Sequence, residues 1–186
     1  APHLRLQIAA ELMRHPWELL HDGEELLGLR YALGRQVFMS APTLRQARRR
    51  TAGAIRVLVI GDPAFSPAFL DELRRPERAV PPQLPEAREE ARRVAQEFER
   101  LRDELAGLPP LAVDALVGES LSVTEMRERL RAGYHIIHYA GHAVFRNGDP
   151  ETSAWLLSDG ELWAREIRNT LAGQDEPPWL IVANAC

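Results

Sequence analysis

The chain has 186 residues, of which 45% are hydrophobic and 27% charged, and its formal net charge is −4. This length is enough for one domain with a substantial core, and the charge balance gives no general attraction for nucleic acid or anionic membranes. No apolar run approaches the roughly 20 residues that a membrane helix needs. The single cysteine excludes an internal disulfide, so a cytoplasmic location is expected.

The first part of the chain, residues 1–53, carries short patterns of secondary structure. Residues 4–10 alternate apolar and polar side chains and predict a strand, and residues 26–32 predict another. Between them, Pro16 is typical of the start of a short helical turn. This part is expected to precede the larger part of the chain, residues 54–186, in which the pattern is more regular.

Strands and helices alternate in the second part of the chain. The β-branched run 55–60 predicts a buried strand, and an apolar stripe over 84–106 predicts a long helix. The charged, proline-containing stretch 70–85 predicts a surface loop. Ser122 followed by Glu125 is the pattern of a capping box at a helix start. The remaining predicted elements are strands at 111–117, 134–139 and 179–183, a hairpin over 154–163 and a helix over 164–171.

This alternation predicts an α/β fold, a three-layer α/β/α sandwich around a mostly parallel sheet. Ligands of such sheets gather at the carboxyl ends of the strands. His142 follows the third predicted core strand, and Cys186 follows the fourth. Because consecutive strands are often neighbours, we expect the two side chains to meet at one edge of the sheet.

A cysteine and a histidine at one sheet edge suit nucleophilic catalysis. A thiol with a pKa near 8.5 needs a nearby base to become a thiolate, and His142 is placed to act as that base and then as an acid for the leaving amine. The N–H groups of Ala143 and Cys186 are the expected donors to the developing oxyanion. The competing interpretation of a lone cysteine is a buried, unreactive thiol.

Two other kinds of site are less well supported by the sequence. If residues 138–142 were helical, His138 and His142 would share a face as in a zinc site, but the Glu of an HExxH motif is missing and the apolar residues favour a strand. His138 and Gly141 are instead expected to support the catalytic histidine, and His135 to pack or face solvent. The turn after the first core strand lacks the G-x-G-x-x-G pattern of a nucleotide site.

Several segments resemble one known family. Residues 134–145 read YHIIHYAGHAVF and resemble the histidine motif of CHAT domains, which are caspase-like domains often found beside TPR repeats. Residues 180–186, LIVANAC, are similar to the cysteine motif of that family. Residues 16–20, PWELL, and 56–61, RVLVIG, resemble an upstream element and the first core strand, so the resemblance covers nearly the whole chain.

The resemblance implies a caspase-like cysteine endopeptidase, with His142 and Cys186 as its dyad and Ala143 and Cys186 as backbone oxyanion donors. It also implies a protein substrate, a bacterial setting, a regulatory domain or partner, and neither metal nor cofactor. Relatives often carry glycine where Ala143 stands. They also continue beyond the cysteine, so this chain is expected to hold a fold truncated after the strand that leads to the nucleophile.

The sequence says less about substrate preference than about the catalytic pair. Metacaspase-like enzymes carry an acid two residues before the cysteine, whereas this chain has Asn184. Asp62 and Glu119, which follow the first two core strands, are candidate acids of a specificity pocket. The alternative function is a catalytically silent CHAT-like scaffold for protein interaction, and a metal- or nucleotide-binding α/β domain ranks below it.

Overall fold

The computed structural model describes residues 3–8, 12, 15–37, 53–74, 81–104, 109–146 and 148–185. The chain divides into two compact units, Ala1–Gln46 and Ala47–Cys186. The sequence-based division after residue 53, into two parts of one domain, stays a prediction. None of the helices in the described ranges is long and apolar enough to cross a membrane.

The first unit is built on two parallel strands. Strand β1 (His3–Ile8) pairs with β2 (Ala32–Val37) along its whole length, so the strand predicted near the start of the chain is confirmed. The turn predicted after Pro16 is the 3-10 helix η2 (Trp17–Leu19).

The strand predicted over residues 26–32 is wrong. Leu27–Arg30 form a single helical turn, α1, and the next strand begins only at Ala32. Arg30 forms ion pairs with three carboxylates of the preceding loop, those of Asp22, Glu24 and Glu25. These contacts favour a helical turn over the extended chain that the side-chain pattern suggests.

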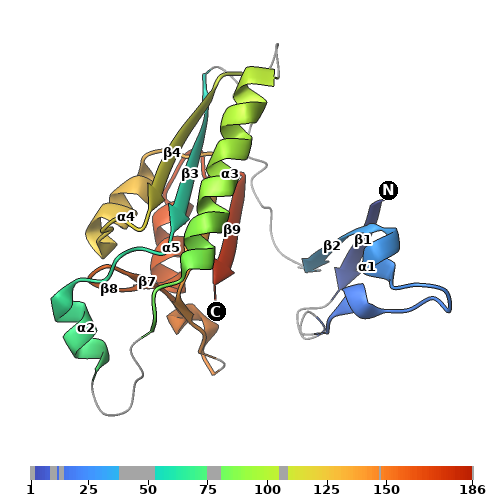
Figure 1. Cartoon of the computed structure of the whole chain (residues 1–186), viewed down its shortest axis with the longest axis horizontal. Helices are drawn as coiled ribbons and strands as arrows, with labels where there is room; N and C mark the ends of the chain where they lie inside the picture. Colours follow the sequence, from blue (N-terminus) through green and yellow to red (C-terminus); the bar gives the residue numbers. More distant parts are fainter. Residues whose placement is uncertain are drawn as a thin grey trace. The chain divides into compact units, whose positions relative to one another are not determined.

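The second unit contains a four-stranded parallel sheet in the order β4-β3-β5-β9 (Figure 1). Its strands are β3 (Ile55–Gly61), β4 (Leu111–Val117), β5 (Ile136–Gly141) and β9 (Leu180–Ala185). Its helices are α2 (Pro67–Leu73), α3 (Pro85–Glu104), α4 (Val123–Arg131) and α5 (Ala164–Ala172). All four core strands were predicted, although β5 and β9 both extend two residues further toward the carboxyl edge.

Side chains of β3 alternate between the two faces of the sheet and define the three layers. Val57 and Val59 are fully buried and pack with Ala91 of α3. Leu58 and Ile60 point the other way, into a core shared with α4 and α5. Burying each such side chain contributes about 1.5–3 kcal/mol. The predicted α/β/α sandwich with a mostly parallel sheet is therefore confirmed.

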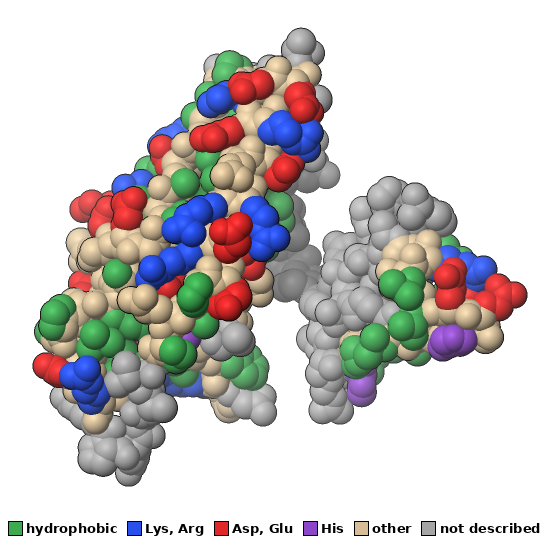
Figure 2. Space-filling view, viewed as in Figure 1, with side chains coloured by type: hydrophobic (Ala, Val, Ile, Leu, Met, Phe, Trp, Pro, Cys, Tyr) green, Lys and Arg blue, Asp and Glu red, His purple; other side chains and the backbone are tan. Residues whose placement is uncertain are grey.

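Helix α3 lies unusually close to the end of β3 because a glycine stands there. A Cβ atom added to Gly61 would lie 2.5 Å from the Cβ of Ala91 and 3.2 Å from the carbonyl oxygen of Ala87. Two small residues, Gly61 and Ala91, therefore let the first turns of the helix approach the carboxyl edge of the sheet. The outward face of α3 carries interspersed acidic and arginine side chains (Figure 2).

A small antiparallel sheet follows the third core strand. It contains β6 (Ala143–Val144), β7 (Ala154–Leu157) and β8 (Gly160–Trp163), with the 3-10 helix η3 (Pro150–Thr152) before β7. The pairing of β7 with β8 is the predicted hairpin, and β6 adds a strand that the sequence did not suggest.

The surface loop predicted over residues 70–85 is partly wrong. Its beginning belongs to α2, which starts at Pro67 and buries Phe69 and Leu73. The Ser66 hydroxyl accepts a hydrogen bond from the Phe69 N–H at 3.2 Å, as an N-cap does. Ser66 followed by Pro67 is the signal that predicts this helix. Residues 75–80 lie outside the described ranges.

Candidate active site

The two strands that lead to His142 and Cys186 are neighbours in the sheet. Strands β5 and β9 run parallel, and their register places Gly141 opposite Ala185. His142 is the first residue after β5, and Ala185 is the last residue of β9. Cys186 itself lies outside the described residues, so the geometry of the site is built from its surroundings.

The His142 ring is held by a loop that comes from another part of the chain. Its Nε2 atom lies 2.6 Å from the carbonyl oxygen of Pro82, and its ring centroid lies 6.0 Å from that of Phe65. Because a carbonyl only accepts hydrogen bonds, Nε2 must carry the hydrogen in this contact. In a neutral imidazole Nδ1 is then the basic nitrogen, the one that can accept a proton.

The Tyr139 hydroxyl holds the main chain of His142 in place. The buried Tyr139 hydroxyl lies 2.8 Å from the carbonyl oxygen of His142 and 2.9 Å from that of Leu156, and it donates to this pair of acceptors. Burial, with a smaller contribution from the charge of Asp62, raises the pKa of Tyr139 far above its usual value, so the hydroxyl stays protonated. The sequence did not single out this tyrosine.

Gly141 leaves the space that this arrangement needs. A Cβ atom at that position would lie 3.0 Å from the Tyr139 hydroxyl. A larger residue would therefore push the hydroxyl away from the His142 carbonyl. The supporting role expected for Gly141 remains a prediction, and this contact gives it a physical basis.

The N–H group of Ala143 is directed away from the hairpin. The Leu156 N–H donates to the His142 carbonyl at 2.9 Å, so His142 and Leu156 form a hydrogen-bonded pair of the antiparallel ladder. The next pair, Ala143 with Trp155, is then of the non-hydrogen-bonded kind, in which the N–H points outward. This orientation suits the oxyanion donor that the sequence predicts at Ala143.

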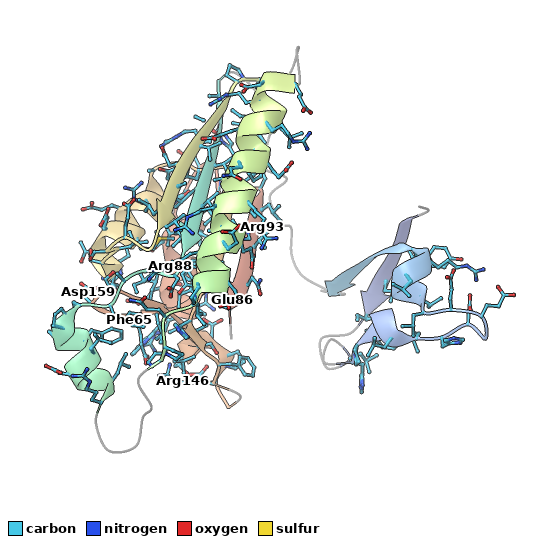
Figure 3. All side chains as sticks on the ribbon, in the orientation of Figure 1. Phe65, Glu86, Arg88, Arg93, Arg146 and Asp159 are labelled. Atoms are coloured by element: carbon cyan, nitrogen blue, oxygen red, sulfur yellow. The ribbon has the colours of Figure 1, made fainter. Side chains whose placement is uncertain are left out.

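The two candidate pocket acids occupy different environments. Asp62 is 3% exposed, and its Oδ2 atom accepts hydrogen bonds from the Leu84 N–H at 3.0 Å and from the Arg88 Nε at 2.9 Å. Figure 3 labels Arg88 beside the first turns of α3. The side chain of Glu119 is exposed, and its carbonyl accepts from the Ala64 N–H at 3.0 Å. Asp62 thus anchors the start of α3, a role that its position after a strand did not suggest.

Replacing this anchor is expected to weaken the fold. The variant Asp62→Asn keeps an oxygen for the Leu84 N–H but removes the charge that faces Arg88, whose side chain is 24% exposed. Partial solvation of Arg88 limits the effect to a loss of about 1–2 kcal/mol in the free energy of unfolding. Urea unfolding measures it, with Asp71→Asn as the control, because Asp71 forms an exposed pair with Arg74. Equal losses in the two variants would contradict the anchoring role.

The other two histidines of the motif lie away from the His142 ring. The Nδ1 atom of His135 accepts a hydrogen bond from the Arg56 N–H at 2.9 Å, and its ring packs on Trp179, as the packing interpretation expects. His138 lies within β5 and is buried, with its Nε2 atom 3.1 Å from Glu90 Oε1. Residues 138–141 are strand, so the helical zinc arrangement does not form. Within the described ranges, no group of three or more His, Cys, Asp or Glu side chains is arranged to hold a metal ion.

A mostly apolar pocket borders the same edge of the sheet. It has a volume of about 180 Å³ and reaches from Ala143 to Ala185. Its other walls come from Val144, Phe145, Ser153, Ala154, Trp155, Ala164, Ile167 and Ala183. The space beside the predicted oxyanion donor is therefore lined by small and apolar side chains.

Comparison with known proteins places the chain in a family. A family model described as the CHAT domain matches residues 1–186. No curated protein and no solved structure matches the chain.

Proposed function

The chain belongs to the CHAT domain family, which is related to caspase-like cysteine peptidases, and on this premise we propose that it hydrolyses peptide bonds with His142 and Cys186 as its catalytic pair. The observation that carries the proposal is the register of β5 and β9, in which Gly141 lies opposite Ala185. Each of these residues is bonded to one member of the pair, and consecutive Cα atoms are only about 3.8 Å apart.

The hydrogen bond between His142 and Pro82 supports the assignment of roles. With Nε2 donating to the Pro82 carbonyl, Nδ1 is the nitrogen that receives the proton of the Cys186 thiol. The carbonyl does for this histidine what a buried carboxylate does in a serine protease triad, because it fixes the ring orientation and the tautomer. The thiolate then attacks the carbonyl carbon of the substrate.

The remaining steps follow from the groups around His142. Negative charge develops on the substrate oxygen, and the N–H groups of Ala143 and Cys186 donate hydrogen bonds to it. His142 gives its proton to the leaving amine as the C–N bond breaks, which leaves an acyl group on the Cys186 sulfur. A water molecule, deprotonated by His142, attacks the thioester and releases the carboxylic acid and the thiol. We propose a protein substrate, and control by an attached or partner module as the family implies.

The reactivity of the thiol tests the proposal. Cys186 is the single cysteine of the chain, so alkylation by iodoacetamide reports on that residue alone. At pH 6 we expect the folded protein to react at least about tenfold faster than the same chain unfolded in urea, because an imidazole partner keeps part of the thiol ionised. Intact-mass spectrometry follows the reaction. A folded protein that reacts more slowly than the unfolded chain would contradict the proposal.

A further inference from the structure

A glutamate of α3 connects the two strands that lead to the catalytic pair. Glu90 Oε1 lies 3.1 Å from the Nε2 atom of His138 on β5. Glu90 Oε2 accepts a hydrogen bond of 2.6 Å from the side-chain amide of Asn184 on β9. One carboxylate, from the helix that covers this face of the sheet, therefore contacts both strands: it accepts a hydrogen bond from Asn184 on β9 and lies close to the His138 Nε2 atom on β5, which makes no hydrogen bond among the described residues.

The His138 end of this contact is buried, whereas the Asn184 end is exposed. The His138 side chain is 8% exposed and the Glu90 side chain 31%. Groups of this kind lose water on burial and stay in such a place only with polar partners. Neither the hydrogen bonds of His142 nor the expected oxyanion donors involve Glu90, so the peptide-bond chemistry leaves these contacts unexplained.

The contact with Glu90 adds to the backbone pairing that holds strand β9 against β5. Within the described sheet it pairs with β5 on one side, and it lies at the edge. Its first residue, Leu180, is 50% exposed, and Val182 is 38% exposed. The contact between Asn184 and Glu90 is made close to the carboxyl end of the strand, two residues before Cys186.

We propose that Glu90 is a positioning residue of the peptidase, which holds Asn184, and with it the segment that ends in Cys186, at a fixed place relative to β5 and His142. The inference rests on the proposed function. Glu90 touches neither the substrate nor the reacting atoms, and it acts through Asn184. Its effect on the reaction rate is expected to be large, because a shift of about 1 Å between reacting groups can lower a rate by two orders of magnitude.

The adjacent glutamate provides a matched control. Glu89 has the same charge and stands on the same helix, but its side chain is 57% exposed and forms only loose pairs with Arg92 at 3.9 Å and Arg93 at 3.7 Å. In Glu90→Ala we expect alkylation of Cys186 at pH 7 to slow about tenfold and its rate–pH profile to move to higher pH. In Glu89→Ala the rate should stay within about twofold of the wild type.

Two further variants separate positioning from general stability. Glu90→Gln keeps an amide oxygen for the Asn184 side chain and should restore most of the alkylation rate. Asn184→Ala should slow the reaction as Glu90→Ala does, and the double variant should be no slower than either single one, because both changes break the same contact. If Glu90→Ala is unfolded at the assay temperature, Glu90→Gln and Asn184→Ala still test the inference. Slowing that multiplies in the double variant, or a Glu90→Ala rate equal to that of Glu89→Ala, would overturn the inference.

The same assay distinguishes this inference from the function on which it rests. A labelling rate that does not change in His142→Ala would remove the catalytic pair, and with it any role for Glu90 in positioning it. A rate that falls in His142→Ala but not in Glu90→Ala, Glu90→Gln or Asn184→Ala would leave the peptidase proposal standing and overturn only the positioning role.

Discussion

The variant His142→Ala is expected to lose at least about a thousandfold in peptide hydrolysis, and its Cys186 thiol should lose its rapid alkylation at pH 6. Without the imidazole, the thiol returns to a pKa near 8.5 and the leaving amine has no proton donor. Peptidases that lose one member of a catalytic pair retain only the rate that substrate binding and the oxyanion donors supply. Cleavage of fluorescently labelled casein and alkylation followed by mass spectrometry measure the two effects.

Two controls accompany this variant. His21→Ala removes an exposed histidine of the first unit and should leave both rates unchanged. Cys186→Ser should abolish cleavage together with alkylation, because the chain holds no second cysteine. Cleavage by His142→Ala at the wild-type rate would refute the assigned base, and equal cleavage by Cys186→Ser would show that another residue carries the reaction.

The variant Gly61→Ala is expected to lower the free energy of unfolding by about 2–4 kcal/mol. Its new Cβ would lie 2.5 Å from the Cβ of Ala91 and 3.2 Å from the Ala87 carbonyl oxygen, distances that force α3 to move away from β3. Excess volume of this kind in a packed core costs about 1–3 kcal/mol, and the displacement would also disturb the pair between Asp62 and Arg88 that anchors the helix.

Urea unfolding followed by circular dichroism measures the loss. Gly53→Ala is the matched control, because a Cβ atom at Gly53 meets nothing within 4 Å, and its free energy of unfolding should change by no more than about 0.5 kcal/mol. Equal stability of the two variants would mean that α3 is free to shift, and the close packing would then have no energetic importance. If α3 moves as expected, the contact between Pro82 and His142 should loosen, and alkylation of Cys186 should slow as well.

Most of the strands and helices could be predicted from local sequence patterns. Strand β3 shows as a run of β-branched residues, and the pairing of β7 with β8 shows as two apolar segments around a short turn. The Ser122 hydroxyl accepts from the Glu125 N–H at 3.1 Å, the capping contact that the sequence predicts for α4. Each of these signals lies within a few neighbouring residues, which is why the sequence reveals them.

Several of the missed features depend on contacts that the local pattern does not show. The turn at α1 is accompanied by ion pairs of Arg30 with acidic residues of the preceding loop, and the anchoring role of Asp62 depends on Arg88, 26 residues later. Glu90 and Asn184 are separated by 94 residues. The catalytic roles of His142 and Cys186 remain predictions that thiol chemistry can test. The neighbouring placement of the strands that lead to them is observed.

The contact that orients His142 has a consequence for genetics. Its acceptor is the main-chain carbonyl of Pro82, and all twenty amino acids carry that oxygen. A saturation screen that exchanges one side chain at a time leaves this acceptor in place at position 82 and detects its importance only through changes that displace the loop. Replacing the amide with an ester at the following bond would weaken the acceptor directly, so chemical protein synthesis can test this proposed partner of His142, which codon replacement cannot remove.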